Sequence, residues 1–140
     1  MHGQGLTVSH VNIDAGLNDY AEKRFDYVIL NESLQQVLQP QKVILEALRV
    51  GKKVIVGIPN FCHISARLQL FFKGRVPITK ELPYEWYNTP NLRFLSLKDF
   101  KFFCQQNEIT ILKQENLAFH KRVHFVPNLF AHIGIFLLKK

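Results

Sequence analysis

The residues best placed for chemistry in this sequence follow two apolar runs that are typical of buried strands. Asn31, Glu32 and Ser33 come directly after the run at residues 25–30, and Pro59-Asn60-Phe61 follows the run at 53–58. With a helix between them, two such runs form parallel strands, and parallel sheets bind ligands at the carboxyl ends of their strands. Glu32 could therefore act as a general acid or base, or bind a substrate amine.

A structural role explains the same residues equally well. Ser33 is a good helix cap, which would leave Glu32 facing solvent, and Asn60 is a good cap for a helix that begins after it. Both interpretations stay open at the level of the sequence.

The densest aromatic cluster lies at residues 82–91, Leu-Pro-Tyr-Glu-Trp-Tyr-Asn-Thr-Pro-Asn. Tyr and Trp offer rigid contact area with a polar tip, which favours recognition of a ligand or a protein partner. The alternative is a structured loop that folds over the sheet edge. We predict a substrate or partner surface made of Asn60, Tyr84, Glu85, Trp86, Tyr87 and Asn91.

Other reactive side chains lack the neighbours that their chemistry needs. His120 and His124 are four residues apart, a spacing that suits a metal on a helix, but no carboxylate accompanies them. Cys62 and His63 are adjacent and cannot easily face each other as nucleophile and base. We therefore predict neither a metal site nor a cysteine nucleophile.

Local patterns predict a single α/β domain over residues 1–140. Residues 75–94 have too little periodicity for a regular element, and long ordered loops of this kind are usually lids or binding surfaces. Strands are expected at 7–13, 25–30, 53–58, 109–112 and 133–138, and helices at 34–50 (or from Pro40), 61–74 and 97–106, the last capped by Ser96.

Composition favours a soluble, cytoplasmic protein. The net charge is +7, but the Lys and Arg residues are dispersed and no nucleic-acid-binding motif accompanies them, so we do not expect nucleic-acid binding. The apolar stretch at 126–138 is too short to span a bilayer, and the sequence does not open with a secretory signal. The two cysteines are expected to be reduced thiols.

Several stretches together resemble the MetW family of methionine-biosynthesis proteins. The segment at 82–91 is the most specific of them, whereas the strand matches alone would be weak. The stretches run in family order over residues 14–17, 25–30, 48–51, 59–61, 67–70, 74–80, 82–91 and 98–100.

The resemblance implies a class I S-adenosylmethionine-dependent methyltransferase fold and a role beside a MetX-type homoserine O-acyltransferase. Family members carry a Gly-rich Asp-x-Gly-x-Gly loop and a ribose-binding acid, and both fall ahead of the first residue of this sequence. The cofactor positions that remain correspond to Asn12, where the family has an acid, and to Asn31 and Glu32. Asn31 stands where Ser is common, and Ile64 where Trp is usual.

The fold expected from this resemblance is a partial Rossmann-like methyltransferase fold that lacks its first two strands, with a mostly parallel sheet and flanking helices. In the complete fold those strands lie between residues 8–13 and 25–30, so the strand at 25–30 would have an unpaired edge. Three outcomes are open: the early strand pairs beside Tyr27, two chains pair edge to edge as a homodimer, or the coding sequence is truncated. We favour truncation or degeneration of the family gene, with dimerisation or new pairing of the early strand as the structural repair.

We therefore predict a MetW-like protein of methionine biosynthesis that binds homoserine O-acyltransferase and holds S-adenosylmethionine poorly. The alternative is an S-adenosylmethionine-dependent methyltransferase with an unknown acceptor. A basic nucleic-acid binder is the weaker alternative.

Overall fold

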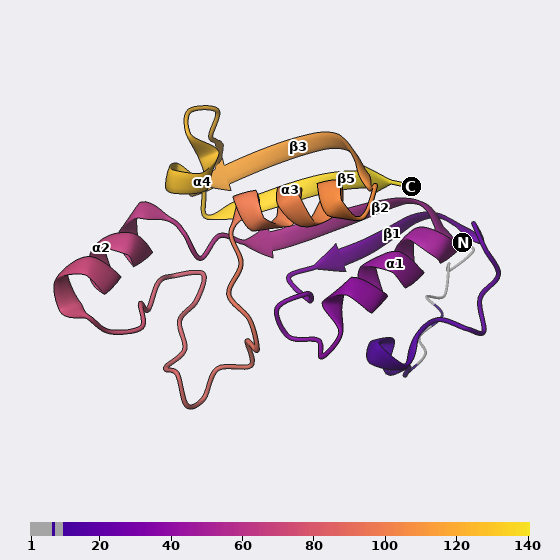
Figure 1. Cartoon of the computed structure of the whole chain (residues 1–140), viewed down its shortest axis with the longest axis horizontal. Coiled ribbons are helices and arrows are strands. Elements are labelled where there is room, and N and C mark those ends of the chain that lie inside the picture. The colour runs from indigo at the N-terminus through magenta and orange to yellow at the C-terminus, as the bar shows by residue number, and fades with distance from the viewer. Residues whose placement is uncertain (1–6, 8–9) are drawn as a thin grey trace, which may run out of the picture.

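Five strands form one sheet in the computed structural model, which describes residue 7 and residues 10–140 (Figure 1). Their order across the sheet is β1 (Phe25–Asn31), β2 (Gly51–Pro59), β5 (Ile133–Lys139), β3 (Thr110–Ala118) and β4 (Lys121–Arg122). β1 and β2 are parallel, as the crossover predicted, but β5 is antiparallel to both β2 and β3. The prediction of a mostly parallel sheet is therefore wrong, because one pairing is parallel and the other three are antiparallel.

Helix α1 (Pro40–Val50) forms the crossover between β1 and β2. It begins at Pro40 and not at residue 34, since proline suits the first turn of a helix and has no N–H to donate further in. Its buried side chains, from Val43 to Val50, recur at three- and four-residue spacing and pack on the sheet.

Helix α3 (Leu97–Gln106) matches its predicted bounds because its start is encoded locally. Ser96 Oγ accepts a hydrogen bond from the Asp99 N–H at 3.1 Å, and Asp99 Oδ2 accepts one from the Ser96 N–H at 3.0 Å. This reciprocal capping box satisfies two donors at the helix start. Helix α2 (Ile64–Lys73) is shorter than predicted and ends at Gly74, whose φ of 57° is left-handed.

Two short helices were not predicted: α4 (Pro127–Phe130) and the 3-10 helix η1 (Ile13–Ala15). Residues 10–12 are not in a strand, so the predicted strand at 7–13 is wrong there, and of the three open outcomes the pairing of this segment beside Tyr27 is not seen in the described residues. Residues 8 and 9 of that prediction lie outside the described residues.

The core lies between the sheet and the two helices α1 and α3, which cover the same face (Figure 1). Val54, Val56, Ile58, Phe136 and Leu138 point into it from the two central strands and are fully buried. Leu48 of α1 and Phe100 of α3 pack against them. Burying these side chains provides the main stabilisation of the domain, at roughly 1.5–3 kcal/mol for each large apolar side chain.

The other face of the sheet is open along β1 in the part of the chain that the structure describes. Tyr27 is 54% exposed and Ile29 is 67% exposed, whereas Leu30, which points toward α1, is 4% exposed. Ile55 and Leu137, which are register partners on that same open face, are half-buried.

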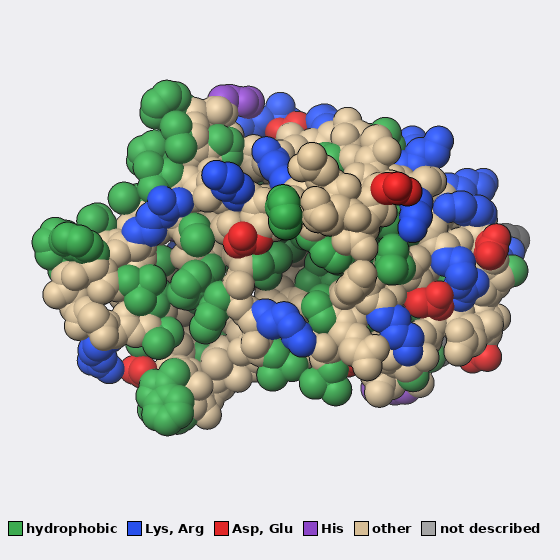
Figure 2. Space-filling model, viewed as in Figure 1, with side chains coloured by type: hydrophobic (Ala, Val, Ile, Leu, Met, Phe, Trp, Pro, Cys, Tyr) green, Lys and Arg blue, Asp and Glu red, His purple; other side chains and the backbone are tan. Residues whose placement is uncertain are grey.

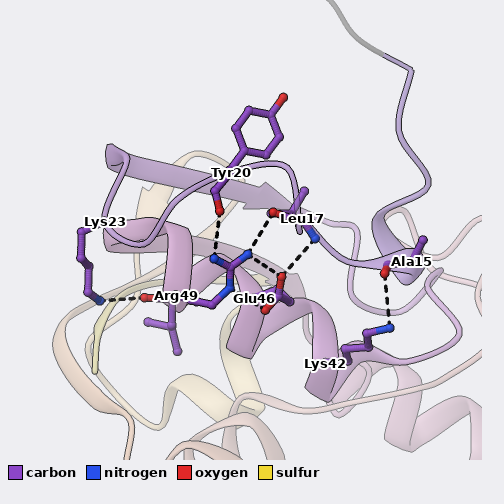
Figure 3. A network of polar contacts seen from close by, with 8 residues as sticks. Ala15, Leu17, Tyr20, Lys23, Lys42, Glu46 and Arg49 are labelled. Carbon is purple, nitrogen blue, oxygen red and sulfur yellow. Dashed lines mark hydrogen bonds and ion pairs between the residues drawn. The ribbon is translucent and has the colours of Figure 1, made fainter.

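A polar network fixes residues 14–23 to α1 (Figure 3). Glu46 accepts hydrogen bonds from Arg49 Nε at 2.8 Å and from the Leu17 N–H at 3.1 Å. Arg49 also donates to the carbonyls of Leu17 and Tyr20, both at 2.9 Å. These hydrogen bonds provide partners for backbone N–H and carbonyl groups of a segment that has almost no regular secondary structure of its own.

Among the residues described, the helices are all too short or too polar to cross a membrane.

Candidate functional site

A cavity of about 480 Å³ lies at the carboxyl edge of β1, where the sequence placed the ligand-binding end of the sheet. Glu32 lines it from the end of β1, and Gln35 from the turn that follows. Segment 80–91 closes another side, and His132 enters from the start of β5. Because β5 runs antiparallel, its first residue meets the last residue of β2, Pro59, and lies at the same edge as the end of β1.

A buried histidine and a carboxylate meet in the cavity wall. His132 is 7% exposed, and its Nδ1 lies 3.0 Å from Glu81 Oε2, within ion-pair distance but outside hydrogen-bond alignment. Within the described chain, Nε2 of His132 has no hydrogen-bond partner. A proton on Nδ1 facing the carboxylate would leave Nε2 free as an acceptor or a base.

His63, the N-cap of α2, stacks on His132 with ring centroids 4.0 Å apart. Burial, followed by the neighbouring His132, lowers the pKa of His63 below its ordinary value, while Glu81 and a backbone hydrogen bond with Phe130 act in the opposite direction. His63 Nδ1 accepts a hydrogen bond from the Ser65 N–H at 3.1 Å. His63 thus supports one face of His132, and its lowered pKa favours the neutral form of the ring.

Gln35 supplies the second buried polar group of the cavity. It is 4% exposed, and its side-chain carbonyl Oε1 lacks a hydrogen-bond partner among the described residues. Its main-chain carbonyl accepts from the Leu92 N–H at 2.7 Å, and Arg93 donates to the carbonyls of Val37 and Leu38 at 2.6 Å. These contacts fix the end of segment 75–94 against the turn that carries Gln35.

Three of the predicted site residues, Glu32, Tyr84 and Asn91, line this cavity together. Glu32 has a positive φ of 48°, and its N–H donates to the Gly57 carbonyl at 2.9 Å. The chain therefore leaves β1 in a conformation that non-glycine residues seldom adopt.

Asn60 does not belong to a substrate or partner surface, which corrects the prediction. Its side chain is 5% exposed, donates to the carbonyls of Asn128 and Ala131 at 3.0 and 2.9 Å, and accepts from the Cys62 N–H at 3.1 Å. Every polar atom of the amide is used to fix α4 to the end of β2. Asn60 is a structural residue.

The remaining positions that the resemblance assigned to S-adenosylmethionine have the following surroundings in the described residues. Asn12 caps η1 by accepting from the Asp14 N–H at 3.0 Å. Asn31 is exposed at the end of β1, and a methyl group at Gly57 would come within 2.6 Å of its Oδ1. Gly57 and Gly134 thus make room for side chains of the chain itself, Asn31 and Leu97. No group of three metal-binding side chains occurs among the residues described.

Glu85, Trp86 and Tyr87 lie outside the cavity. Trp86 is 73% and Tyr87 is 69% exposed, and their rings meet edge to face at 5.7 Å. Phe71 and Phe72 of α2 are 81% and 76% exposed. Gln69 joins the two regions, because its side chain both donates to and accepts from the backbone of Ile78, at 3.0 and 3.2 Å.

We call Phe71, Phe72, Trp86 and Tyr87 the aromatic surface. Figure 2 shows hydrophobic side chains at the end of the molecule that α2 and α4 occupy in Figure 1, with further hydrophobic and basic side chains spread over this face. Isolated exposed apolar residues are ordinary, whereas contiguous patches of large ones are typical of interaction sites.

Sequence reasoning missed Gln35, Glu81 and His132. Each is unremarkable in its local context, and the three are brought together from distant segments by the fold. His132 carried the only local signal, a polar residue that interrupts an apolar stretch just before a buried strand.

Comparison with known proteins agrees with this architecture. The profile described as Methionine biosynthesis protein MetW matches residues 2–138. The chain belongs to the MetW family of methionine biosynthesis proteins. The chain is also 35% identical over 109 residues to the Bifunctional methionine biosynthesis protein MetXA/MetW of Rhodopirellula baltica, an alignment that covers 77% of this chain and 18% of that protein.

The chain therefore spans about a fifth of the length of that MetXA/MetW relative. Among solved structures, a crystal structure provisionally described as Zn-dependent alcohol dehydrogenases from Rhodobacter sphaeroides superposes with a TM-score of 0.63. The match covers 98% of this MetW-family chain and 66% of the other, at 15% identity. At that identity the likeness concerns the fold alone.

Proposed function

We propose that this MetW-family chain acts in methionine biosynthesis by binding a homoserine O-acyltransferase of the MetX type. The observation that carries the proposal is the relative in which MetXA and MetW form one polypeptide. A linker keeps two fused domains at a high effective concentration near each other. A MetW-family chain that is separate from the acyltransferase has no such linker, so it needs a binding interface to form the same complex.

The aromatic surface is the part of the molecule best suited to that interface. Aromatic residues dominate the energetic centres of protein interfaces, and a single one typically contributes at least about 2 kcal/mol when it is fully covered. Trp86 and Tyr87 are anchored in a segment whose ends are fixed by Gln69 on α2 and by Arg93, so they lose little freedom on binding.

The test is a binding measurement between the full chain and the acyltransferase of the same organism. Trp86→Ala combined with Tyr87→Ala should weaken the complex by a factor of roughly 30 or more, or abolish co-purification. Phe102→Ala is the matched control, because Phe102 is a 62% exposed aromatic residue on α3, away from the aromatic surface. A complex of unchanged affinity in the double variant would refute this interface.

We also propose that this polypeptide binds S-adenosylmethionine poorly. Support comes from Asn12, whose side chain is used as a helix cap, and from the strand glycines, which face side chains of the chain itself. The rival function, methyl transfer from S-adenosylmethionine, is favoured by the cavity at the carboxyl end of β1, where Glu32 lies. Calorimetric titration separates the two: micromolar binding of S-adenosylmethionine by residues 1–140 would refute the impaired-cofactor proposal.

A further inference from the structure

The cavity at the end of β1 contains buried polar atoms that the protein itself leaves without partners. Gln35 and His132 both line it, and their unpartnered atoms Oε1 and Nε2 belong to side chains that are more than nine-tenths buried. A buried acceptor without a donor destabilises the fold, so such atoms are rare unless a ligand or water completes them. Two of them in one cavity point to a ligand site.

The charge of the cavity wall is opposite to that of the chain. Glu32 and Glu81 supply two carboxylates and Lys80 one ammonium, which leaves the wall at −1 with neutral histidines, in a chain whose net charge is +7. Lys80 Nζ lies 5.7 Å from the centroid of the Phe119 ring, so the one wall ammonium already has a neighbour. The charged groups of the wall are therefore mainly carboxylates, which accept hydrogen bonds.

A cavity wall with two carboxylates and unpartnered acceptors favours a ligand that donates several hydrogen bonds and carries positive charge. A primary ammonium has three donors and no acceptor. The Gln35 carbonyl and the Glu81 carboxylate can each accept from it, while His132 Nε2, with Glu81 facing Nδ1, can accept from a hydroxyl of the same ligand. The volume of about 480 Å³ falls within the range of small-molecule sites.

We infer that this cavity binds a small protonated primary amine that also carries a hydroxyl group. The ammonium contacts Gln35 and Glu81, and the hydroxyl contacts His132. This site does not depend on the proposed acyltransferase interface, because neither Trp86 nor Tyr87 lines the cavity.

The experiment titrates the full chain with three small molecules of similar length and different charge, followed by amide chemical shifts in NMR spectra. Aminobutanol is the cation, butanediol the neutral isostere and hydroxybutanoate the anion. At concentrations up to about 50 mM, within reach of so small a ligand, aminobutanol should shift resonances around residues 32–36 and 80–91. It should bind at least about tenfold more tightly than butanediol, since the charge-assisted hydrogen bonds are lost in the diol.

Two variants locate the site. Glu81→Gln removes the charge while keeping the shape and should weaken aminobutanol binding by about ten- to hundredfold. Gln35→Leu removes the unpartnered carbonyl, so it should weaken binding while leaving the urea midpoint unchanged or higher. Glu85→Gln is the matched control, because Glu85 belongs to the same segment but does not line the cavity.

Three results would overturn the inference: no shifts with aminobutanol, equal or tighter binding of the diol or the anion, or unchanged binding in folded Gln35→Leu. If Glu81→Gln does not fold, the Gln35 variant and the three-ligand series still decide the matter.

Discussion

Replacing Glu46 with glutamine should remove a pH-dependent part of the stability of this domain. Glu46 accepts from Arg49 and from the Leu17 N–H, and these contacts hold the segment ahead of β1 on α1 (Figure 3). The hydrogen bond from Arg49, followed by that from Leu17, lowers the pKa of Glu46 from 4.5 to about 2. Because the folded pKa lies below the unfolded one, the contribution is present above about pH 4.5 and is lost as the pH falls toward 2.

The size of the effect follows from the same two values. A difference between 4.5 and about 2 corresponds to about 3 kcal/mol at about 1.4 kcal/mol per pH unit. The side chains of Glu46 and Arg49 are 20% and 28% exposed, so water screens the pair. Screening reduces the expected contribution to roughly 1–2 kcal/mol at neutral pH.

The assay is urea denaturation followed by far-ultraviolet circular dichroism at several pH values from 7 down to about 2.5. Tryptophan fluorescence is less suitable, because the single tryptophan, Trp86, is 73% exposed in the folded state. Glu46→Gln should be less stable than the wild type at pH 7 by roughly 1–2 kcal/mol, and most of that gap should close at the acidic end.

Asp26→Asn is the control for this prediction. Asp26 forms a 2.7 Å ion pair with Lys52, but the two side chains are 78% and 60% exposed, so its removal should leave the pH profile of stability unchanged. A difference in the free energy of unfolding between wild type and Glu46→Gln that stays constant at every pH would refute the assigned role of the Glu46 carboxylate.

Ser96→Ala removes the hydroxyl that caps α3 and should lower the free energy of unfolding by about 1 kcal/mol in urea; an unchanged midpoint would contradict the capping role. Phe136→Ala empties a fully buried ring position that packs 4.8 Å from the Phe100 ring, so it should cost about 3–5 kcal/mol, and a wild-type melting temperature would argue against this core. Cys62 should react with iodoacetamide well before Cys104, because burial raises the pKa of Cys104 to about 11. Equal labelling of both cysteines in the native protein, measured by peptide mass spectrometry, would show that Cys104 is accessible.

The parts of the fold that sequence predicted well are those fixed by neighbouring residues. Ser96 and Asp99 encode the start of α3 three residues apart, and Pro40 encodes the start of α1. The crossover from β1 to β2 follows from two apolar runs separated by one helix. Each of these signals lies within a short window of the chain.

The direction of β5 and the extent of β3 could not be predicted in this way. β5 lies between β2 and β3, and its antiparallel pairing is decided by contacts with strands that are distant in the sequence. β3 continues from Thr110 to Ala118 through a polar run, Lys113 to Asn116, which has no strand-like alternation. The side chains of this run are exposed or half-buried, so apolar residues are not needed there.

The residues of the candidate site also differ in whether a local sequence signal could reveal them. Glu32 was predicted because it follows a strand directly, and Tyr84 and Asn91 because they belong to a dense aromatic segment. Gln35, Glu81 and His132 became visible only when the fold brought three remote segments to one edge. The predicted surface role of Asn60 failed because its side-chain amide instead forms buried hydrogen bonds to the backbone, a role that the sequence alone does not reveal.

The position of β5 also has a consequence during synthesis of the protein. β3 pairs with β5 and the two-residue β4, so β3 has no long partner until residues 133–139 have left the ribosome. At ~5–20 residues per second, synthesis of the 21 residues from 119 to 139 delays that pairing by about one to four seconds. During this interval the nascent chain presents an unpaired strand and an incomplete core, the state in which chaperones and aggregation compete for it.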